Sequence, residues 1–521
     1  MTEHKPFLAA FFRTLIDAPR VTVCLGLVLI LATATGLTHL YKDTSVDAFI
    51  PADHPSLLAN DRTAEVFGLT EPIAVAVMRR DGSTIFTAEA YEMIATLTDA
   101  IAGLPNVHDD RVVSLATESS IRGEDASLLV DAYLEPGMDE GAIADASARW
   151  RNMPPHVNSL VAADGSGAVI MAELVDSAAA AETYEAVQVL VSELLAKKAD
   201  ADHDILIAGP GAVSGYLSSY IDQDARVLQP VVFLLIMAFL YVAFRSSRAL
   251  LGPLLVVVGA AGGALGVMAW NGVAYFAITN ALPVILVSIS VADAIHVLSA
   301  YYQLRARRPS MPVREAIVLT MTEMSRPISL TTLTTMAGFI GIGVASIMPP
   351  IQYFAWYATL GVALAWLFSI VVLPAAMMLL KLAPSPAFTA WQAQRPDRLG
   401  TLLTRIGAVG AARPGLVLGA FTALLVFAAA GASQLRVDRS QVENFAADEP
   451  IRIADERINE AFAGTAFLDV IVDVDGAGDL LESERMRRIA ALQAFMDGLP
   501  HMAKTVSIVD YLSLLHYALE E

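Results

Sequence analysis

Long apolar runs alternate with two extended hydrophilic segments along this chain of 521 residues. A membrane-spanning helix needs about 20 mostly apolar residues. Seven runs meet that requirement, near residues 20–39, 228–244, 250–271, 278–302, 328–348, 353–381 and 414–433. The pattern predicts a multispan α-helical membrane protein with about seven transmembrane helices.

The first hydrophilic segment alternates short β-like runs with helical ones. Strands are predicted at 73–78, 112–116, 128–134, 169–174 and 205–208, and helices at 88–103, 139–151 and 178–197. A Gly-Pro-Gly turn within 206–227 then leads into a helix that enters the second span. Strand–helix–strand, twice over, predicts an α+β ferredoxin-like domain. The second hydrophilic segment begins alike, with a strand predicted at 467–472 and a helix at 482–498.

The two hydrophilic segments are related by an internal repeat with a constant offset of 395 residues. Matching positions include Leu40/Leu435, Asp43/Asp438, Ser45/Ser440, Asp53/Asp448 and Pro55/Pro450. The first apolar run could be a cleaved signal peptide. Its repeat partner at 414–433 is internal, however, which favours a membrane anchor. The repeat also predicts that the second copy is incomplete, through truncation, a split gene or a genuine half-transporter, of which we favour truncation.

Charge is distributed unevenly between the two kinds of segment. Residues 39–226 carry 11 Lys/Arg against 31 Asp/Glu, residues 434–521 carry 8 against 17, and the rest of the chain carries 15 against 6. The positive-inside rule therefore places the short basic loops in the cytoplasm and the acidic segments on the other side. The acidic segments argue against nucleic acid as a partner. The single cysteine, Cys24, excludes an intramolecular disulfide.

One acidic residue, Asp293, lies within an apolar run. A carboxylate near the bilayer centre costs roughly 2.5–3.5 kcal/mol on insertion scales, so its presence needs a reason. His296 follows at i+3, on the same helical face. The functional interpretation is a proton relay formed by Asp293 and His296, and the alternative is a buried polar pair that only fixes helix packing.

Several hydroxyl groups could support such a relay. Ser288 and Ser290 precede Asp293 by about one turn, and the fifth span supplies Thr331, Thr332, Thr334 and Thr335. We name Ser290, Thr331 and Thr335 as possible relay support. The alternative is that the threonines bond the carbonyl groups of their own helix. The third span contains Gly259, Gly262, Gly263 and Gly266 at GxxxG spacing, which predicts close helix packing.

Neither an enzymatic constellation nor a cofactor motif is present in the sequence. It has no phosphate-binding GxxxxGK[ST] loop, which argues against ATP as the energy source. The histidines of the hydrophilic segments lack metal-ligand spacing, so no metal site is predicted. We therefore expect no cofactor and no enzymatic activity.

The run from Ser288 to Tyr301 around Asp293 resembles the proton-relay segment of the resistance-nodulation-division (RND) superfamily. The run Arg326–Phe339 resembles the fifth-span signature of that superfamily, whose lipid-exporter branch includes the MMPL proteins and the "predicted exporter" group. The chain departs from the pattern at Ile289, where a glycine is frequent, and at Ala294, where a tyrosine is frequent.

The resemblance implies seven segments. They are a cytoplasmic N-terminus (1–19), a first span (20–39), a periplasmic porter domain (40–227), a five-span sterol-sensing-like bundle (228–381), a cytoplasmic linker (382–413), a seventh span (414–433) and the start of a second porter domain (434–521).

The resemblance also implies a function. We expect a proton-motive-force-driven exporter of lipids or other hydrophobic or amphiphilic molecules in the bacterial inner membrane. Its partners would be the lipid bilayer, the cargo, and a periplasmic carrier or further copies of the chain. The alternative is a non-transporting lipid- or sterol-sensing protein or scaffold.

Overall fold

The structure, a computed structural model, describes residues 6–520 except 46, 68–70, 125–126, 136, 199–201, 385, 387, 390–397, 436–441 and 473–480. The chain divides into two compact units. Residues 1–41, 225–346 and 351–440 form the first, which we call the helical unit. Residues 42–224, 347–350 and 441–521 form the second, which we call the α+β unit.

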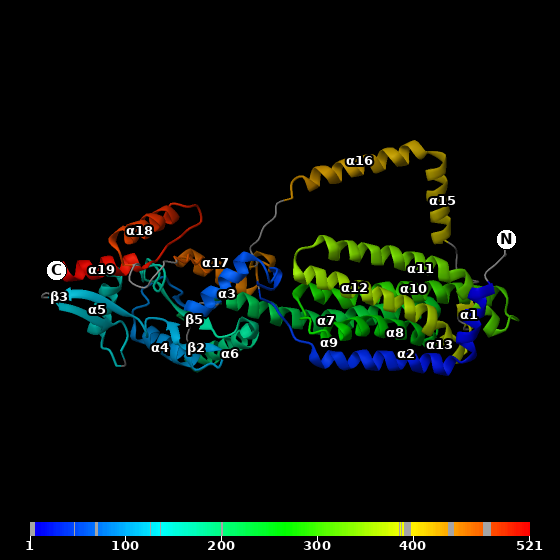
Figure 1. Ribbon diagram of the computed structural model, residues 1–521, viewed down its shortest axis with the longest axis horizontal. Coiled ribbons are helices and arrows are strands. Elements are labelled where there is room, and N and C mark those ends of the chain that lie inside the picture. The colour runs from blue at the N-terminus through cyan, green and yellow to red at the C-terminus, as the bar shows by residue number, and fades with distance from the viewer. Residues whose placement is uncertain are drawn as a thin grey trace. The chain divides into compact units, whose positions relative to one another are not determined.

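The helical unit contains a bundle of long helices that run alongside one another, whereas its last two helices, α15 (Arg398–Ala412) and α16 (Pro414–Ala432), are drawn apart from them (Figure 1). Its elements are α1 (Pro6–Asp17), α2 (Pro19–Ala34), the membrane part of α7 (Pro210–Phe244), α8 (Leu251–Val257), α9 (Gly263–Trp270), α10 (Ala281–Arg307), α11 (Val313–Ala345), α12 (Pro349–Leu367) and α13 (Leu373–Leu379), followed by α15 and α16. Two π-helical segments, η6 (Val258–Gly262) and η8 (Phe368–Val372), join α8 to α9 and α12 to α13.

Seven helices in the described part of the chain are long and apolar enough to cross a membrane. They are Pro19–His39, Pro210–Phe244, Ser247–Trp270, Ala277–Arg307, Val313–Ala345, Pro349–Leu379 and Pro414–Ala432. The number predicted from the apolar runs is therefore confirmed. The second, fourth and fifth helices extend well beyond the apolar runs, because polar turns continue them past the apolar stretch.

Glycine permits the close crossing of the first and third membrane helices. A Cβ atom on Gly266 would lie 2.0 Å from the Thr33 carbonyl oxygen, so no larger residue fits there. Gly259 and Gly263 also face side chains of α12–η8, namely Phe368 and Leu364. The predicted packing role is confirmed for these three glycines. It is wrong for Gly262, because no atom lies within 4 Å of the position that a Cβ atom would take there.

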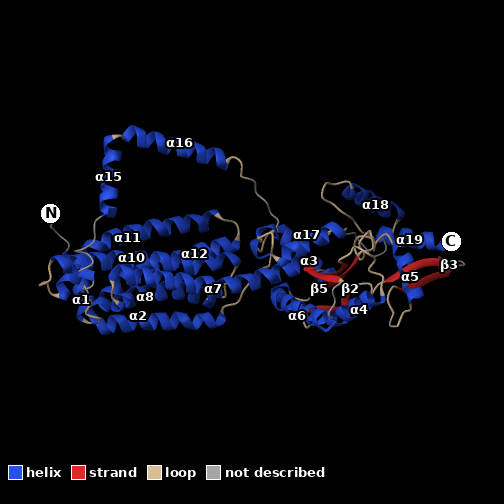
Figure 2. Cartoon of the chain, turned by 180° about the vertical axis from the view of Figure 1, so that it is seen from behind, coloured by secondary structure: helices blue, strands red, loops and turns tan. Residues whose placement is uncertain are grey.

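The α+β unit is built on a four-stranded antiparallel sheet, whose strands are red in Figure 2. The strands are β1 (Pro72–Arg79), β2 (Val107–Val113), β5 (Gly167–Leu174) and β6 (His203–Ala208), in the order β2-β5-β1-β6. Helix α4 (Ala88–Ala102) connects β1 to β2, and α6 (Ala180–Lys198) connects β5 to β6. A hairpin of β3 (Ser119–Glu124) and β4 (Ser127–Ala132) and helix α5 (Glu140–Arg149) lie between these two halves of the sequence.

The two faces of the sheet are covered by different parts of the chain. On one face, Ile73, Val75 and Val77 of β1 join the core formed with α4 and α6. On the other face, Ala74, Ala76 and Met78 pack against α17 (Pro450–Ala461) through Ile458 and neighbouring apolar residues. A helix from the second hydrophilic segment therefore completes the domain that the first segment begins.

The repeat seen in the sequence recurs in the secondary structure at the same offset. Helix α4 begins and ends 395 residues before α18 (Ser483–Asp497), and α3 (Pro55–Phe67) begins 395 residues before α17. Helix α2 is related to α16 in the same way at its first residue. The residues that precede these two helices, Ala18 and Arg413, share a similar non-helical backbone.

Two local predictions are wrong, and two elements were not predicted. The strand predicted at 112–116 is β2, which begins earlier and ends at Val113, because the chain turns at Ser114. Strand β3 was not predicted, and neither was α19 (Ile508–Glu520), which packs on it. No strand forms at 467–472, although its repeat counterpart is β1, because the described residues offer it no neighbouring strand to pair with.

Candidate functional site

Asp293 lies in the middle of α10, on the side of that helix that packs into the bundle. Only 7% of its surface is exposed. Among the residues that the structure describes, none donates a hydrogen bond to its carboxylate, and His296 is the single charged group that acts on it. A buried carboxylate without a hydrogen-bond donor is costly when ionised and inexpensive when protonated. The site can therefore hold a proton.

His296 and Ser288 are exposed residues of the same helix, α10. The Ser288 hydroxyl donates to the Val284 carbonyl of the same helix at 2.9 Å. The spacing of i+3 brings His296 within one turn of Asp293, as predicted, but the two side chains lie in different environments.

Ser290, one turn before Asp293, is completely buried. Its hydroxyl has no hydrogen-bond partner among the described residues, and the same is true of the fully buried Ser369 hydroxyl in η8. Buried polar groups in proteins almost always have a partner, which can be an internal water molecule. These two hydroxyls therefore mark polar positions within an otherwise apolar core.

Both π-helical segments contact α10. A π-helical turn interrupts the regular helix and is frequent at functional sites. Neither segment was predicted from the sequence. Ser369 was not predicted as a site residue either, although its isolated position in the apolar run Phe368–Val372 was a possible signal. The polar residues near Asp293 thus come from α10 itself, whereas the irregular backbone comes from the helices packed against it.

The threonines of α11 use their hydroxyls within their own helix. Thr331 donates to the carbonyls of Pro327 and Ile328, and Thr335 donates to that of Thr331 at 2.9 Å. Thr332 and Thr334 likewise bond preceding carbonyls. This geometry corresponds to the alternative weighed from the sequence, and a relay role for Thr331 and Thr335 stays a prediction.

Two comparisons with known proteins bear on this site. The family described as Patched SSD matches residues 227–379, a stretch that includes α8 to α13 and therefore Asp293. The chain is also similar to the probable transport protein MmpL10 of Mycobacterium leprae (strain TN), with 24% identity over 355 residues, 64% of this chain and 33% of that protein. Both similarities support an RND/MMPL-type family with a sterol-sensing-like domain.

The chain is thus a multi-pass membrane protein with similarity to a transport protein. It spans about a third of the length of the mycobacterial relative that it matches. The Patched SSD match covers the part of the chain that surrounds Asp293, whereas the α+β unit lies largely outside it.

A second titratable group lies in the α+β unit, next to the first residue of β1. Burial, with the neighbouring Asp47 and Asp43 carboxylates and against a hydrogen bond from Ser214, raises the pKa of Glu71 to about 7. The Ser214 hydroxyl lies 3.3 Å from the Glu71 carboxylate. Glu71 was not predicted as a site residue, because its neighbours come from distant parts of the chain. Among the described residues, no group of three or more His, Cys, Asp or Glu residues could hold a metal ion.

Proposed function

We propose that this chain belongs to a proton-motive-force-driven exporter of lipids or other hydrophobic or amphiphilic molecules, acting in the bacterial inner membrane. Protonation of Asp293 would drive the cycle, with His296 passing protons to and from it. The α+β unit would act as a periplasmic porter domain that handles the cargo.

The observation that carries the proposal is the burial of Asp293 without a hydrogen-bond donor in the described part of the chain. Ionisation of such a carboxylate favours a rearrangement that gives it water or a counter-charge, and protonation favours the packed state. A group of this kind converts a proton gradient into a difference between two helix packings. The π-helical segments beside α10 are places at which such packing can change.

The topology of the sheet supports the porter assignment. The strand order β2-β5-β1-β6, with α4 after β1 and α6 after β5, is that of two interleaved β-α-β units. This is the arrangement expected of a ferredoxin-like domain. Its strongly acidic sequence and the basic loops between the spans support a location on the periplasmic side.

A second candidate function is lipid or sterol sensing without transport. The Patched SSD match favours it, because the matched residues, 227–379, form the five-helix part of the bundle. A sensor would bind a lipid and change conformation, but lipid movement would not follow an imposed proton gradient.

Reconstitution into proteoliposomes separates the two functions. We expect a pH gradient across the liposome membrane to drive transfer of an NBD-labelled phospholipid. The gradient itself, followed by pyranine fluorescence, should dissipate faster when the protein is present. Asp293→Asn should abolish both signals at unchanged expression. Glu323→Gln removes an exposed acid of α11 by the same isosteric change and should have no effect. Gradient-independent lipid binding in the wild type would favour the sensor, and unchanged flux in Asp293→Asn would exclude the relay.

A further inference from the structure

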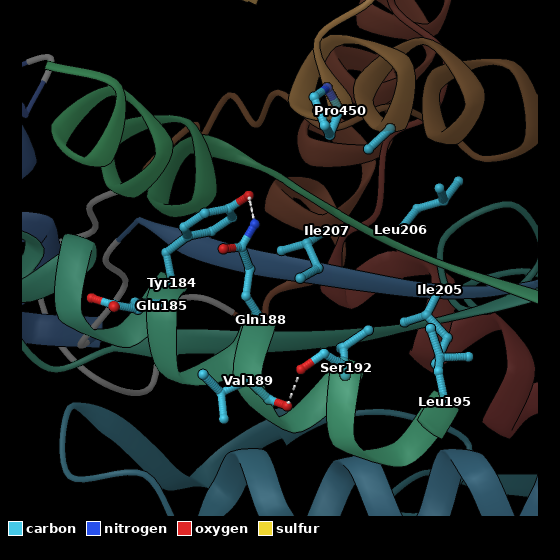
Figure 3. A pocket seen from close by; sticks show the side chains of 12 residues that line it. Tyr184, Glu185, Gln188, Val189, Ser192, Leu195, Ile205, Leu206, Ile207 and Pro450 are labelled. Atoms are coloured by element: carbon cyan, nitrogen blue, oxygen red, sulfur yellow. Dashed lines mark hydrogen bonds between the residues drawn. The ribbon is translucent and has the colours of Figure 1, made fainter. Parts of the chain in front are cut away.

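The outer edge of the sheet in the α+β unit is an open slot. Strand β6 is an edge strand, because β1 pairs with one side of it and no described strand pairs with the other. A cavity of about 530 Å³ follows this edge, a size typical of binding sites. Figure 3 shows its lining side chains, which come from α6, β6 and the beginning of α17.

The slot has two walls, one on each face of the sheet. Ile205 and Ile207 of β6 pack on the α6 side, with the core shared by α4 and α6. Leu206, between them, packs on the α17 side, near Ala454. The cavity therefore surrounds the open edge of β6, and its floor is the backbone of that strand.

The exposed backbone of β6 determines which kind of ligand fits the cavity. An edge strand presents a row of N–H and C=O groups that point away from the sheet. An acyl chain covers such groups without bonding them, which is costly, whereas an extended polypeptide pairs with them. On α6 the lining residues extend from Tyr184 to Leu195, 11 helical steps or roughly 16 Å at the helical rise. That length accommodates about five residues of a strand at roughly 3.3 Å each.

The two walls differ in chemistry. The α6 wall carries Glu185, Gln188, Ser192 and the Tyr184 hydroxyl, which accepts a hydrogen bond from Gln188 at 2.7 Å. Glu182 and Glu193 lie on the same helix. The α17 wall is formed by Pro450 and Ala454 and is apolar. Because alternate side chains of a strand point to opposite faces, one set of an incoming strand would meet the Glu185 carboxylate and polar groups of α6, and the other would meet the small apolar residues Pro450 and Ala454.

We propose that this slot binds an extended segment of a partner protein by strand addition to β6, and that the segment alternates basic with apolar residues. Its main chain pairs with the outer edge of β6, its basic side chains face Glu185 and α6, and its apolar side chains face Pro450 and Ala454. The location of the partner in the periplasm rests on the proposed function, but the slot does not.

The test uses the full chain in nanodiscs of zwitterionic phosphatidylcholine, which leaves both membrane sides accessible and does not attract basic peptides. The probe is a fluorescein-labelled peptide of eight residues that alternates valine and lysine, and binding is measured by fluorescence anisotropy. We expect saturable binding, at least tenfold weaker when the backbone of every second residue is N-methylated. Replacing lysine by glutamate in the peptide should also weaken binding at least tenfold.

Matched variants locate the binding site. Ser192→Trp fills the slot and should weaken binding at least tenfold, whereas Ala196→Trp, at an exposed position of α6 outside the slot, should leave it unchanged. Glu185→Lys should reverse the preference between the lysine and glutamate peptides. Circular dichroism of each variant verifies that the fold is kept.

Three outcomes would overturn the proposal. Equal binding of the N-methylated and the unmodified peptide would show that the cavity binds amphiphiles and does not pair with a strand. Absence of peptide binding together with a dimeric mass in the nanodisc would assign the edge to a second copy of the chain. Equal loss in Ser192→Trp and Ala196→Trp would place the binding site elsewhere. None of these outcomes depends on proton-driven flux, so the proposed function is tested separately.

Discussion

Arg457 of α17 forms an ion pair with Asp204 of β6, with a distance of 2.6 Å between Nη1 and Oδ2. The partners are 253 residues apart in the sequence, and Arg80 binds the other carboxylate oxygen of Asp204. Burial would raise the pKa of Asp204, but the hydrogen bonds of Arg80 and Arg457 outweigh it and hold the pKa below its usual value. The second hydrophilic segment is thus attached to the first by a charged contact beside an apolar one.

Arg457→Ala should lower the free energy of unfolding of the α+β unit by about 0.5–1 kcal/mol, because the pair is partly exposed and Arg80 remains. Urea denaturation followed by tryptophan fluorescence measures the change. Arg488→Ala removes a more exposed pair, with Glu484 on α18, and should cost less. A larger loss in the control would contradict this ranking.

Ile458→Ala should destabilise the α+β unit by about 2–5 kcal/mol, since Ile458 is 1% exposed and fills the core between α17 and the sheet. Hydrogen exchange should accelerate in β1 and β6. The matched control is Thr63→Ala, the repeat counterpart on α3, whose hydroxyl bonds the Ala59 carbonyl of its own helix. Equal acceleration in both variants would mean that α17 does not cover the sheet.

Gly266→Ala should lower the Tm of the detergent-solubilised protein, because the new methyl group would meet the Thr33 carbonyl and force the two helices apart. Overpacking of this kind costs about 1–3 kcal/mol. Gly262→Ala makes the same change where no atom lies within 4 Å, and should leave the Tm unchanged or slightly higher. A Tm that falls equally in both would refute the steric explanation.

Glu71→Gln should stabilise the α+β unit at pH 8 and have little effect at pH 4. The pKa of Glu71 is about 7 in the folded state, above its ordinary value of 4.5, so the folded state binds the proton more tightly. Wild-type stability therefore falls as pH rises from about 4.5 to 7. The expected gain at pH 8 is about 1–2 kcal/mol after allowance for solvent screening.

Denaturation of both proteins at several pH values measures this effect. Glu135→Gln, an exposed acid of the same unit, serves as the control and should show no such pH dependence. A gain that is the same at pH 4 and pH 8 would rule out titration of Glu71 as its cause.

Local sequence patterns were sufficient for the membrane helices and for most of the α+β elements. The seven spans follow from length and hydropathy, and β1, β5 and α4 follow from periodicity, because each depends on its own residues. The position of Asp293 in an apolar run likewise follows from the local sequence. The burial of Asp293 and the exposure of His296 do not, because the rotation of α10 in the bundle is set by the helices packed against it.

What the sequence could not indicate depends on distant partners. The strand predicted at 467–472 has the composition of β1 but lacks adjacent strands in the described residues, so propensity alone does not form it. The contact between α17 and β1 joins residues almost 400 positions apart. The π-helical segments depend on one additional residue in a helical turn, which hydrophobic periodicity does not resolve.

The packing of α17 on the sheet has a consequence for biogenesis. A ribosome completes β1, β5 and β6 long before it reaches Pro450, and the helices from α8 to α16 are synthesised in between. Throughout that interval the sheet face formed by Ala74, Ala76 and Met78 has no α17 to cover it. The α+β unit can therefore mature only after the intervening helices have been inserted. Until α17 emerges, the nascent chain presents an apolar surface to chaperones.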